Sequence, residues 1–307
     1  MYAYIARRLL LAIPTLLAIS LVTFWMGYLS PSDPISIRLG EKADPEIVAR
    51  VKHEYGLDLS PWQQYFNFIK NAASGSFGQS LVFTGQTVGQ QIREGLPKSG
   101  IIAVFAIIVT TMVAIPAGIL TALFRDTWID RLTMFLVVLG ISVPNFVMAF
   151  LFMYVIAFKM KLVPVAGWGQ WTNAVLPIAI LGIRPAAFVT RLTRSSMLDV
   201  LGQDYIRTAR AKGLAERVVI FIHALRNALI PVVTTLGTIF GGLITGSFFI
   251  EQIFAVPGIG RMSVTAIYLR DYPAIQAITL LVATIFVLMN LLVDITYSLI
   301  DPRIKYS

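Results

Sequence analysis

The chain has 307 residues, of which 57% are hydrophobic and only 13% are charged, and its mean hydropathy is +0.76. A soluble domain carries about 25% charged residues, so this composition excludes an ordinary soluble protein and indicates a membrane protein. The absence of cysteine excludes structural disulfides and thiolate metal sites.

Six apolar stretches are long enough to cross a hydrocarbon core of about 30 Å, which takes roughly 20 helical residues. They are Leu9–Tyr28, Gly100–Phe124, Leu132–Phe158, Ala174–Thr190, Ala228–Ile250 and Ala274–Ile300. Arg7 and Arg8 precede the first stretch, but no small-x-small cleavage site follows it, so we interpret it as a retained span rather than a signal peptide. The sequence therefore predicts an all-α integral membrane protein with six transmembrane helices.

The orientation follows from the basic residues, because Lys and Arg near span ends are retained on the cytoplasmic side. With the amino terminus inside, thirteen basic residues fall on inner segments: Arg7, Arg8, Arg125, Arg131, Arg191, Arg194, Arg207, Arg210, Lys212, Arg217, Arg226, Arg303 and Lys305. The short outer connections carry four, which are Lys159, Lys161, Arg261 and Arg270. We expect both termini in the cytoplasm. Because this asymmetry accounts for most of the net charge of +9, no nucleic acid partner is needed to explain it.

The one long outer segment, Pro31–Lys98, has amphipathic character. Asp44 and Pro45 are typical of a helix start, and Gly56 of its end. A second helix is predicted to begin at Ser60 and Pro61, and a third to run over Thr87–Leu96. A cap that only shields the outer mouth and a partner-docking surface are both consistent with this pattern.

Small residues at spacing i, i+4 occur on two spans: Gly237 with Gly241 and Gly242 with Gly246 on the fifth, and Ala114, Gly118 and Ala122 on the second. Such pairs let helix backbones approach closely. They predict a compact helix bundle.

Few ionisable or polar groups lie within the spans, where each is unfavourable unless it faces a cavity or a partner. Arg184, Asn145 and Glu251 are candidates for lining a translocation path. For Arg184, a structural partner on a carbonyl or carboxylate is an equal alternative. His53 and His223 are expected to be surface residues rather than metal ligands, because the topology separates them.

The chain contains no Gly-Lys pair and therefore no Gly-rich phosphate loop that ends in Gly-Lys-Ser/Thr. It also has no series of membrane carboxylates suited to a proton relay. We therefore expect no catalytic activity and no cofactor on this chain, and any energy for uphill transport comes from another polypeptide.

The densest basic run lies between the fourth and fifth spans. The pattern predicts a short helix over Gln203–Ala211, a left-handed stop at Gly213 and a second helix over Ala215–Ala228 that continues into the fifth span. Anionic headgroups would attract such a surface. Charge alone does not explain why the turn is kept small, which favours insertion into a groove on a partner. We expect Ala209 to face that partner, so that a glutamate there would clash with it.

The run RTARAKGL (Arg207–Leu214), followed by HALRNALIPV (His223–Val232), resembles the cytoplasmic coupling motif of ABC importer permeases in its peptide-transporter form. Six further motifs match this family in order: RRLLLAIPTLL (Arg7–Leu17), GSFGQSL (Gly75–Leu81), TRLTRSSML (Thr190–Leu198), EQIFAVPGIG (Glu251–Gly260), RDYPAIQ (Arg270–Gln276) and LIDPRIK (Leu299–Lys305). The length and the ending are most similar to the first ("B") permease of oligopeptide and dipeptide importers.

The resemblance implies a type I importer permease fold in a bacterial cytoplasmic (inner) membrane. It implies as partners a second homologous permease, two ABC ATPases that bind ATP and Mg, an extracytoplasmic peptide-binding protein and a peptide substrate. The chain would divide into a first span (1–30), an extracytoplasmic helical region (31–98) and a five-helix core (99–307). A coupling helix at about 203–214 would contact an ATPase through Tyr205, Arg207, Thr208, Ala209, Arg210, Ala211, Lys212, Gly213 and Leu214.

Three alternatives differ from a peptide permease. Some importers of this family carry nickel or another chelate. A secondary transporter would need paired inverted repeats with ion-binding carboxylates, and a channel would need a filter sequence, and neither pattern is found.

The outer loop with Pro257, Gly258, Ile259 and Gly260 is predicted to form a tight turn, which either reaches into a docked binding protein, as scoop-like loops do, or packs on the bundle.

Overall fold

The computed structural model describes residues 2–30, 35, 39, 44–83 and 85–300, and every structural statement below refers to these residues. They are helical apart from connecting loops, with a single isolated β-bridge between Gln79 and Thr87. The chain divides into two compact units, Met1–Ser99 with Val256–Val287, and Gly100–Ala255 with Leu288–Ser307. The segment 256–287 belongs to the same unit as residues 1–99.

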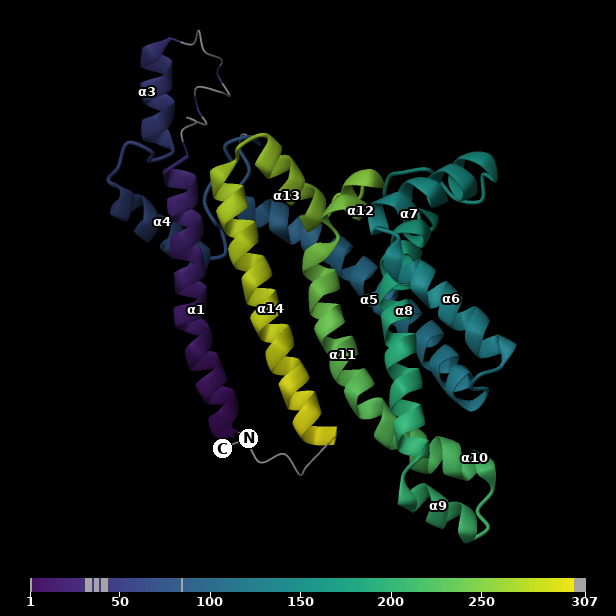
Figure 1. Ribbon diagram of the computed structural model, residues 1–307. Coiled ribbons are helices and arrows are strands. Elements are labelled where there is room, and N and C mark those ends of the chain that lie inside the picture. Colours follow the sequence, from purple (N-terminus) through teal and green to yellow (C-terminus); the bar gives the residue numbers. More distant parts are fainter. Residues whose placement is uncertain (1, 31–34, 36–38, 40–43, 84, 301–307) are drawn as a thin grey trace. The chain divides into compact units, whose positions relative to one another are not determined.

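Five helices are long and apolar enough to cross a membrane (Figure 1). They are α1 (Tyr2–Tyr28), α5 (Val88–Leu123), α8 (Thr172–Leu201), α11 (Leu225–Gly246) and α14 (Tyr272–Ile300). The fourth predicted span is an unbroken helix in spite of Pro177 and Pro185. The fifth ends earlier than predicted, because Ser247 separates α11 from a short helix, α12 (Phe248–Ile253).

The third predicted span, Leu132–Phe158, is wrong as a single helix. Its residues form α6 (Trp128–Ser142), α7 (Asn145–Phe152) and a π-helical turn, η1 (Met153–Lys159), with a bend of 103° between α6 and the α7–η1 pair. Pro144 explains the break. A proline disfavours the helical conformation of the residue before it, and Val143 is extended at φ −85° and ψ 123°. If the bent pair counts as one span, the described residues contain up to six.

The two short helices after α1 begin as predicted. Asp44 accepts a hydrogen bond from the Glu46 amide at 3.0 Å and caps α3 (Pro45–Glu54), and Gly56 lies beyond its end at φ +66°. Ser60 and Gln63 form a capping box at the start of α4 (Pro61–Ala73). These local signals therefore fix both helix starts.

Helix α4 packs along α1. The Tyr65 hydroxyl lies 3.0 Å from the Ser20 Oγ, and the rings of Trp25 and Trp62 are 5.9 Å apart. Aromatic side chains of this kind concentrate where a membrane meets water. The cluster therefore indicates the level at which α1 leaves the bilayer.

The predicted third outer helix, Thr87–Leu96, does not exist as a separate element, because it forms the first turns of α5. A loop ahead of it carries the GSFGQSL motif and is tied to the start of α14. Ser80 Oγ donates to Asp271 Oδ2 at 2.5 Å, and the Leu81 amide donates to Asp271 Oδ1 at 3.2 Å. Asp271 also accepts from the Ala274 amide and so caps α14. A helix that the sequence did not predict, α13 (Ile259–Tyr268), precedes this cap.

In the second unit the small residues lie at close helix contacts, as predicted. A Cβ atom added to Gly118 of α5 would lie 2.4 Å from Thr193 Cβ of α8, and one added to Gly237 of α11 would lie 2.3 Å from Val293 Cγ2 of α14. Gly242 differs, since a Cβ atom there would meet nothing within 4 Å. The side chain environment of Gly246 lies outside the described residues.

A buried ion pair joins α6 to α8. Arg194 donates from Nε to Asp130 Oδ1 at 2.8 Å and from Nη2 to Asp130 Oδ2 at 2.7 Å, and Asp130 is buried. The Asp126 amide also donates to Asp130. Bidentate geometry with an additional hydrogen bond is what an ion pair needs in order to compensate for its desolvation. Arg194 lies in the TRLTRSSML motif.

Candidate functional site

The basic run folds into a short helix, α9 (Asp204–Ala211), beyond the end of α8 (Figure 1). Gln203 is extended and separates the two helices. At the other end the Gly213 amide donates to the Arg210 carbonyl at 2.9 Å and the Leu214 amide to the Ala209 carbonyl at 3.4 Å, with Gly213 at φ +75°. These two bonds form a Schellman motif, which satisfies the last carbonyls of the helix. The left-handed stop predicted at Gly213 is confirmed.

The chain then returns to the membrane without a break. After α10 (Glu216–Val218) and a π-helical turn, η2 (Val219–Ala224), it continues as α11, so that one helical segment extends over Glu216–Ile244. The predicted second helix that continues into the fifth span is therefore confirmed. We call α9, α10 and the turn between them the knob.

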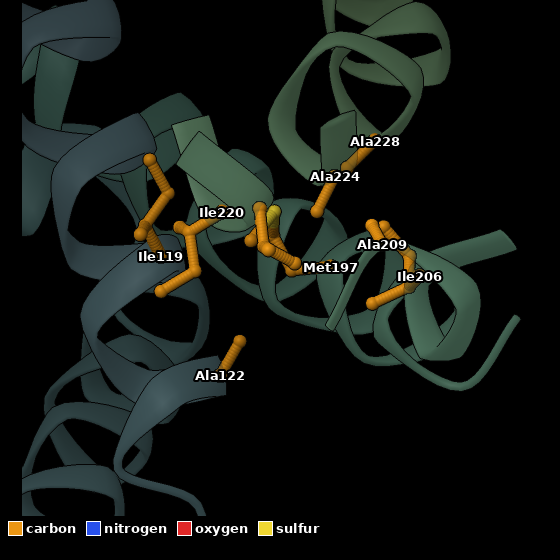
Figure 2. Packing of buried hydrophobic residues seen from close by; sticks show 9 residues of the cluster. Ile119, Ala122, Met197, Ile206, Ala209, Ile220, Ala224 and Ala228 are labelled. Carbon is orange, nitrogen blue, oxygen red and sulfur yellow. The ribbon is translucent and has the colours of Figure 1, made fainter. Parts of the chain in front are cut away.

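The inner face of α9 is part of an apolar core. Ile206 and Ala209 lie three residues apart and therefore on one side of the helix. Figure 2 shows them beside Met197 of α8, in a cluster that also contains side chains of α5, η2 and α11. The full buried set is Ile119, Ala122, Met197, Ile206, Ala209, Val219, Ile220, Ala224 and Ala228. Four elements thus share one core with α9.

The expectation that Ala209 faces a partner is wrong. Ala209 is only 8% exposed and faces the chain's own core, so it does not present a surface to another protein. The reason is the helical period, since the position three residues after the buried Ile206 lies on the same side. The outer surface of the knob instead consists of Tyr205, Arg207, Thr208, Arg210, Ala211, Lys212, Gly213 and Leu214, all of which are exposed.

Polar contacts fix the turn of the knob. Arg210 donates to Glu216 from Nη2 at 2.6 Å and from Nε at 3.1 Å, and this hydrogen-bonded carboxylate raises the pKa of Arg210 above its ordinary value. Asn227 Nδ2 donates to the Tyr205 hydroxyl at 2.8 Å and ties the start of α9 to α11. Arg207 is not engaged in this way, because its side chain is 78% exposed and lies 3.4 Å from an exposed Asp204. Arg207 and Lys212 therefore offer the charges that an outside partner would meet.

The position of α9 connects an exposed surface to the apolar core of the second unit. The exposed face of α9 carries the small side chains Thr208 and Ala211, which allow close approach. The buried face belongs to an apolar cluster that also contains residues of α5, α8, η2 and α11. The knob is therefore packed against the same core as the ends of three membrane helices.

The three path candidates lie in different environments. Arg184, near the middle of α8, is exposed and has no ion pair or hydrogen bond among the described residues. Asn145 begins α7 at the 103° bend, and its buried Oδ1 has no hydrogen-bond partner in the described part of the chain. Glu251 is fully buried and accepts a hydrogen bond from Ser247, so it lies inside the chain and not at its surface.

The predicted scoop-like loop is mostly buried. Gly258, Ile259 and Gly260 are buried where α13 begins, and only Pro257 is exposed. Ile259 packs with Val88 and Ile92, and its amide donates to Ser99 Oγ at 2.8 Å. This environment favours the alternative in which the loop packs on its own unit.

Two family matches cover most of the chain. Residues 114–306 match the family described as the binding-protein-dependent transport system inner membrane component. Residues 1–86 match the amino-terminal part of such membrane components. The chain belongs to this permease family. The knob lies within the first of these matches.

Full-length relatives of the permease have the same length or nearly so. It is 39% identical over 307 residues to the glutathione transport system permease protein GsiC of Escherichia coli (strain K12), with 100% of both chains covered. It is 40% identical over 334 residues to the dipeptide transport system permease protein DppB of Alkalihalophilus pseudofirmus, again with 100% of both chains covered.

Solved structures share the fold of the permease. A structure of the MetNI methionine ABC transporter in an inward-facing conformation matches with a TM-score of 0.57 at 16% identity, over 69% of this chain and 97% of that one. An amino acid ABC transporter crystallised with histidines matches with a TM-score of 0.52 at 16% identity, over 70% and 94%. The permease is therefore an all-α integral membrane protein of the type I importer fold.

Replacing Ala209 by glutamate should destabilise the permease, because it places a carboxylate in the core of Ile206 and Met197. An unpaired buried charge costs roughly 3 to 5 kcal/mol. Ala211→Glu on the exposed side of the same helix is the matched control and should change stability by less than about 0.5 kcal/mol. Thermal unfolding of both purified full-length variants in detergent measures the difference. Equal melting temperatures would show that Ala209 is not in the core.

Proposed function

We propose that this chain is the first of two permease subunits in an ATP-driven importer of short peptides. The observation that carries the proposal is the identity of 39–40%, over the whole chain, to permeases named for glutathione, a tripeptide, and for dipeptides. These named cargoes favour peptides over nickel or another chelate. The partners are a second permease, two ATPases that bind ATP and Mg, and an extracytoplasmic peptide-binding protein.

In this proposal the knob couples ATP hydrolysis to transport. The exposed face of α9 enters a groove on an ATPase, where Arg207 and Lys212 meet carboxylates and Ala211 allows close contact. Coupling requires a rigid element that both sites bias. The Schellman turn, the Arg210–Glu216 pair and the shared apolar core supply that rigidity.

Ala211→Glu should uncouple the importer, because a bulky acid on the docking face clashes with the groove and opposes its carboxylates. In a reconstituted importer we expect peptide-stimulated ATP hydrolysis and peptide uptake to fall by about tenfold, equivalent to about 1.4 kcal/mol. Arg217→Glu, exposed on α10 outside that face, is the charge control and should have a smaller effect. Because one charge near a membrane surface is worth about 1 kcal/mol, equal and mild losses in both variants would mean that the knob is a lipid anchor.

We further propose that the importer lies in a bacterial cytoplasmic membrane, with both termini and the knob in the cytoplasm and residues 31–98 outside. The excess of basic residues on the inner segments supports this orientation. The aromatic cluster of α1 and α4 is consistent with it, because it lies at the opposite end of α1 from Arg7 and Arg8.

Single cysteines test this topology, because the chain has none of its own. Cysteines at the exposed positions Ser74 and Ala215 should react with a membrane-impermeant maleimide from opposite sides. In intact cells we expect labelling at Ser74, and at Ala215 only after the membrane is made permeable. Labelling of both positions from one side would contradict the topology.

A stripe on α8 supports its place along the translocation path. Arg184, Phe188, Arg191 and Ser195 follow one another at spacings of four, three and four residues, and all four are exposed. The Arg191 guanidinium lies 5.9 Å from the centre of the Phe188 ring. An arginine such as Arg184 on a lipid-facing surface would be unfavourable, whereas a water-filled path between two permeases accommodates it. Neither the buried Asn145 Oδ1 nor the fully buried Glu251 is exposed to such a path.

Arg184→Gln should lower peptide uptake by about tenfold, since a hydrogen bond to a charged group contributes roughly 1.5 to 3 kcal/mol and the substrate carboxylate would lose one. The matched control is Arg131→Gln, at another exposed arginine. Initial uptake rates and recovery of the second permease on purification are the two measurements. If Arg184→Gln prevents the second permease from co-purifying, the arginine is a structural partner and not a path residue.

A further inference from the structure

A cavity of about 690 Å³ lies within the first unit and takes no part in the coupling described above. Its walls come from α1, α3, α4, the GSFGQSL loop and the beginning of α14. Small-molecule pockets measure roughly 300 to 1,000 Å³, so a short peptide fits its volume. The wall brings together two family motifs without a role so far, Gly75–Leu81 and Arg270–Gln276, which Ser80 and Asp271 join by a hydrogen bond.

The lining combines carboxamides with aromatic rings. Asn67, Asn71 and Gln276 contribute amide side chains, and Phe68, Phe77 and Tyr272 contribute rings. Among the described lining residues the charged ones are Lys52 and Glu54, one of each sign. The cavity is therefore polar and aromatic without an excess of charge, which suits a ligand with no net charge.

Gln276 is the observation that points to a ligand. It lines the cavity and is only 9% exposed, and its carboxamide makes no hydrogen bond to any described residue. The fully buried side-chain atoms without a partner among the described residues are Gln91 Nε2 and Asn145 Oδ1, so the Gln276 amide is open to the cavity and available to a molecule that enters it. Gly27 keeps the space beside this amide open, because a Cβ atom there would lie 3.3 Å from Gln276 Nε2. What enters the cavity can satisfy the amide.

We propose that this cavity binds the peptide backbone of the cargo, as a site on the outer side of the permease that the peptide occupies before it enters the path. The proposal rests on the proposed function and topology. A carboxamide offers a donor and an acceptor, as a peptide bond does, so Gln276 can pair with any backbone whatever its side chains. The rings accept apolar side chains without selecting one. A lipid acyl chain would leave the Gln276 amide unsatisfied.

Photo-crosslinking locates the site directly. The complete importer is reconstituted in nanodiscs without the peptide-binding protein and illuminated with a tripeptide, Ala-photoleucine-Ala, that carries a diazirine. We expect crosslinks within residues 64–81 and 272–276, and competition by unlabelled trialanine. Crosslinks confined to other segments would overturn the proposal.

Variants then test the role of the amide. Gln276→Leu should weaken binding of radiolabelled trialanine by about tenfold, and Asn67→Trp, at an exposed lining position, should do the same by filling the cavity. Gln86→Leu removes an exposed carboxamide outside the cavity and should leave binding unchanged. Asn67→Trp decides the matter if Gln276→Leu fails to assemble.

The same variants separate this proposal from the function on which it rests. If the wild-type importer with its binding protein transports trialanine, and both cavity variants bind and transport it as Gln86→Leu does, the cavity is not a peptide site and the proposed function stands. If the wild-type importer transports no peptide, both proposals are overturned.

Discussion

The close approach of α5 to α8 is the contact on which the second unit depends. Within a bilayer, apolar surface alone does not drive helices together, because lipid is as apolar as leucine, so association relies on close packing and interhelical hydrogen bonds. Gly118 and Gly182 provide both. A Cβ atom on Gly182 would lie 3.1 Å from the Ala106 carbonyl oxygen, and Thr110 Oγ1 donates to the Gly182 carbonyl at 3.1 Å. Ile119, one residue beyond Gly118, belongs to the same apolar cluster as Ile206 and Ala209 of α9.

The knob is held mainly by apolar burial. Exposed ion pairs contribute about 0 to 1 kcal/mol, and the Arg210–Glu216 pair is roughly half exposed. Complete burial of an isoleucine such as Ile206 stabilises by about 1.5 to 3 kcal/mol. The apolar cluster that holds α9 also contains residues of three membrane helices. In the first unit, the Asp271 carboxylate accepts a hydrogen bond from Ser80 in a loop distant in sequence. The same carboxylate caps α14.

Local signals in the sequence predicted local structure well. The caps at Asp44 and Ser60 and the stop at Gly213 depend on residues within one helical turn, and the structure confirms each. Pro144 is a signal for a break after Ser142. The break was not predicted because the residues on both sides of Pro144 form one long apolar stretch. The spacing of Ile206 and Ala209 would have been sufficient to place both on the buried face of α9. The prediction instead followed the small size of Ala209, which favoured a docking role.

Contacts between distant residues could not be predicted in this way. Asp130 and Arg194 are 64 positions apart, and Ser80 and Asp271 are 191 apart, so no periodic pattern connects either pair. The short helix α9 could be predicted because its residues are contiguous. The cavity was missed because its walls come from five separate segments, and Gln276 has no special feature until its environment is known.

In the proposed importer, the exposed Arg184 would make the stability of this chain depend on its partner subunits. A chain inserted alone would present this guanidinium, near the middle of α8, to acyl chains, where an arginine costs about 2.5 to 3.5 kcal/mol. Total folding free energies are only about 5 to 15 kcal/mol, so this is a large fraction of what keeps an orphan subunit folded. In the proposed importer, a subunit made in excess of its partners would therefore be less stable than an assembled one.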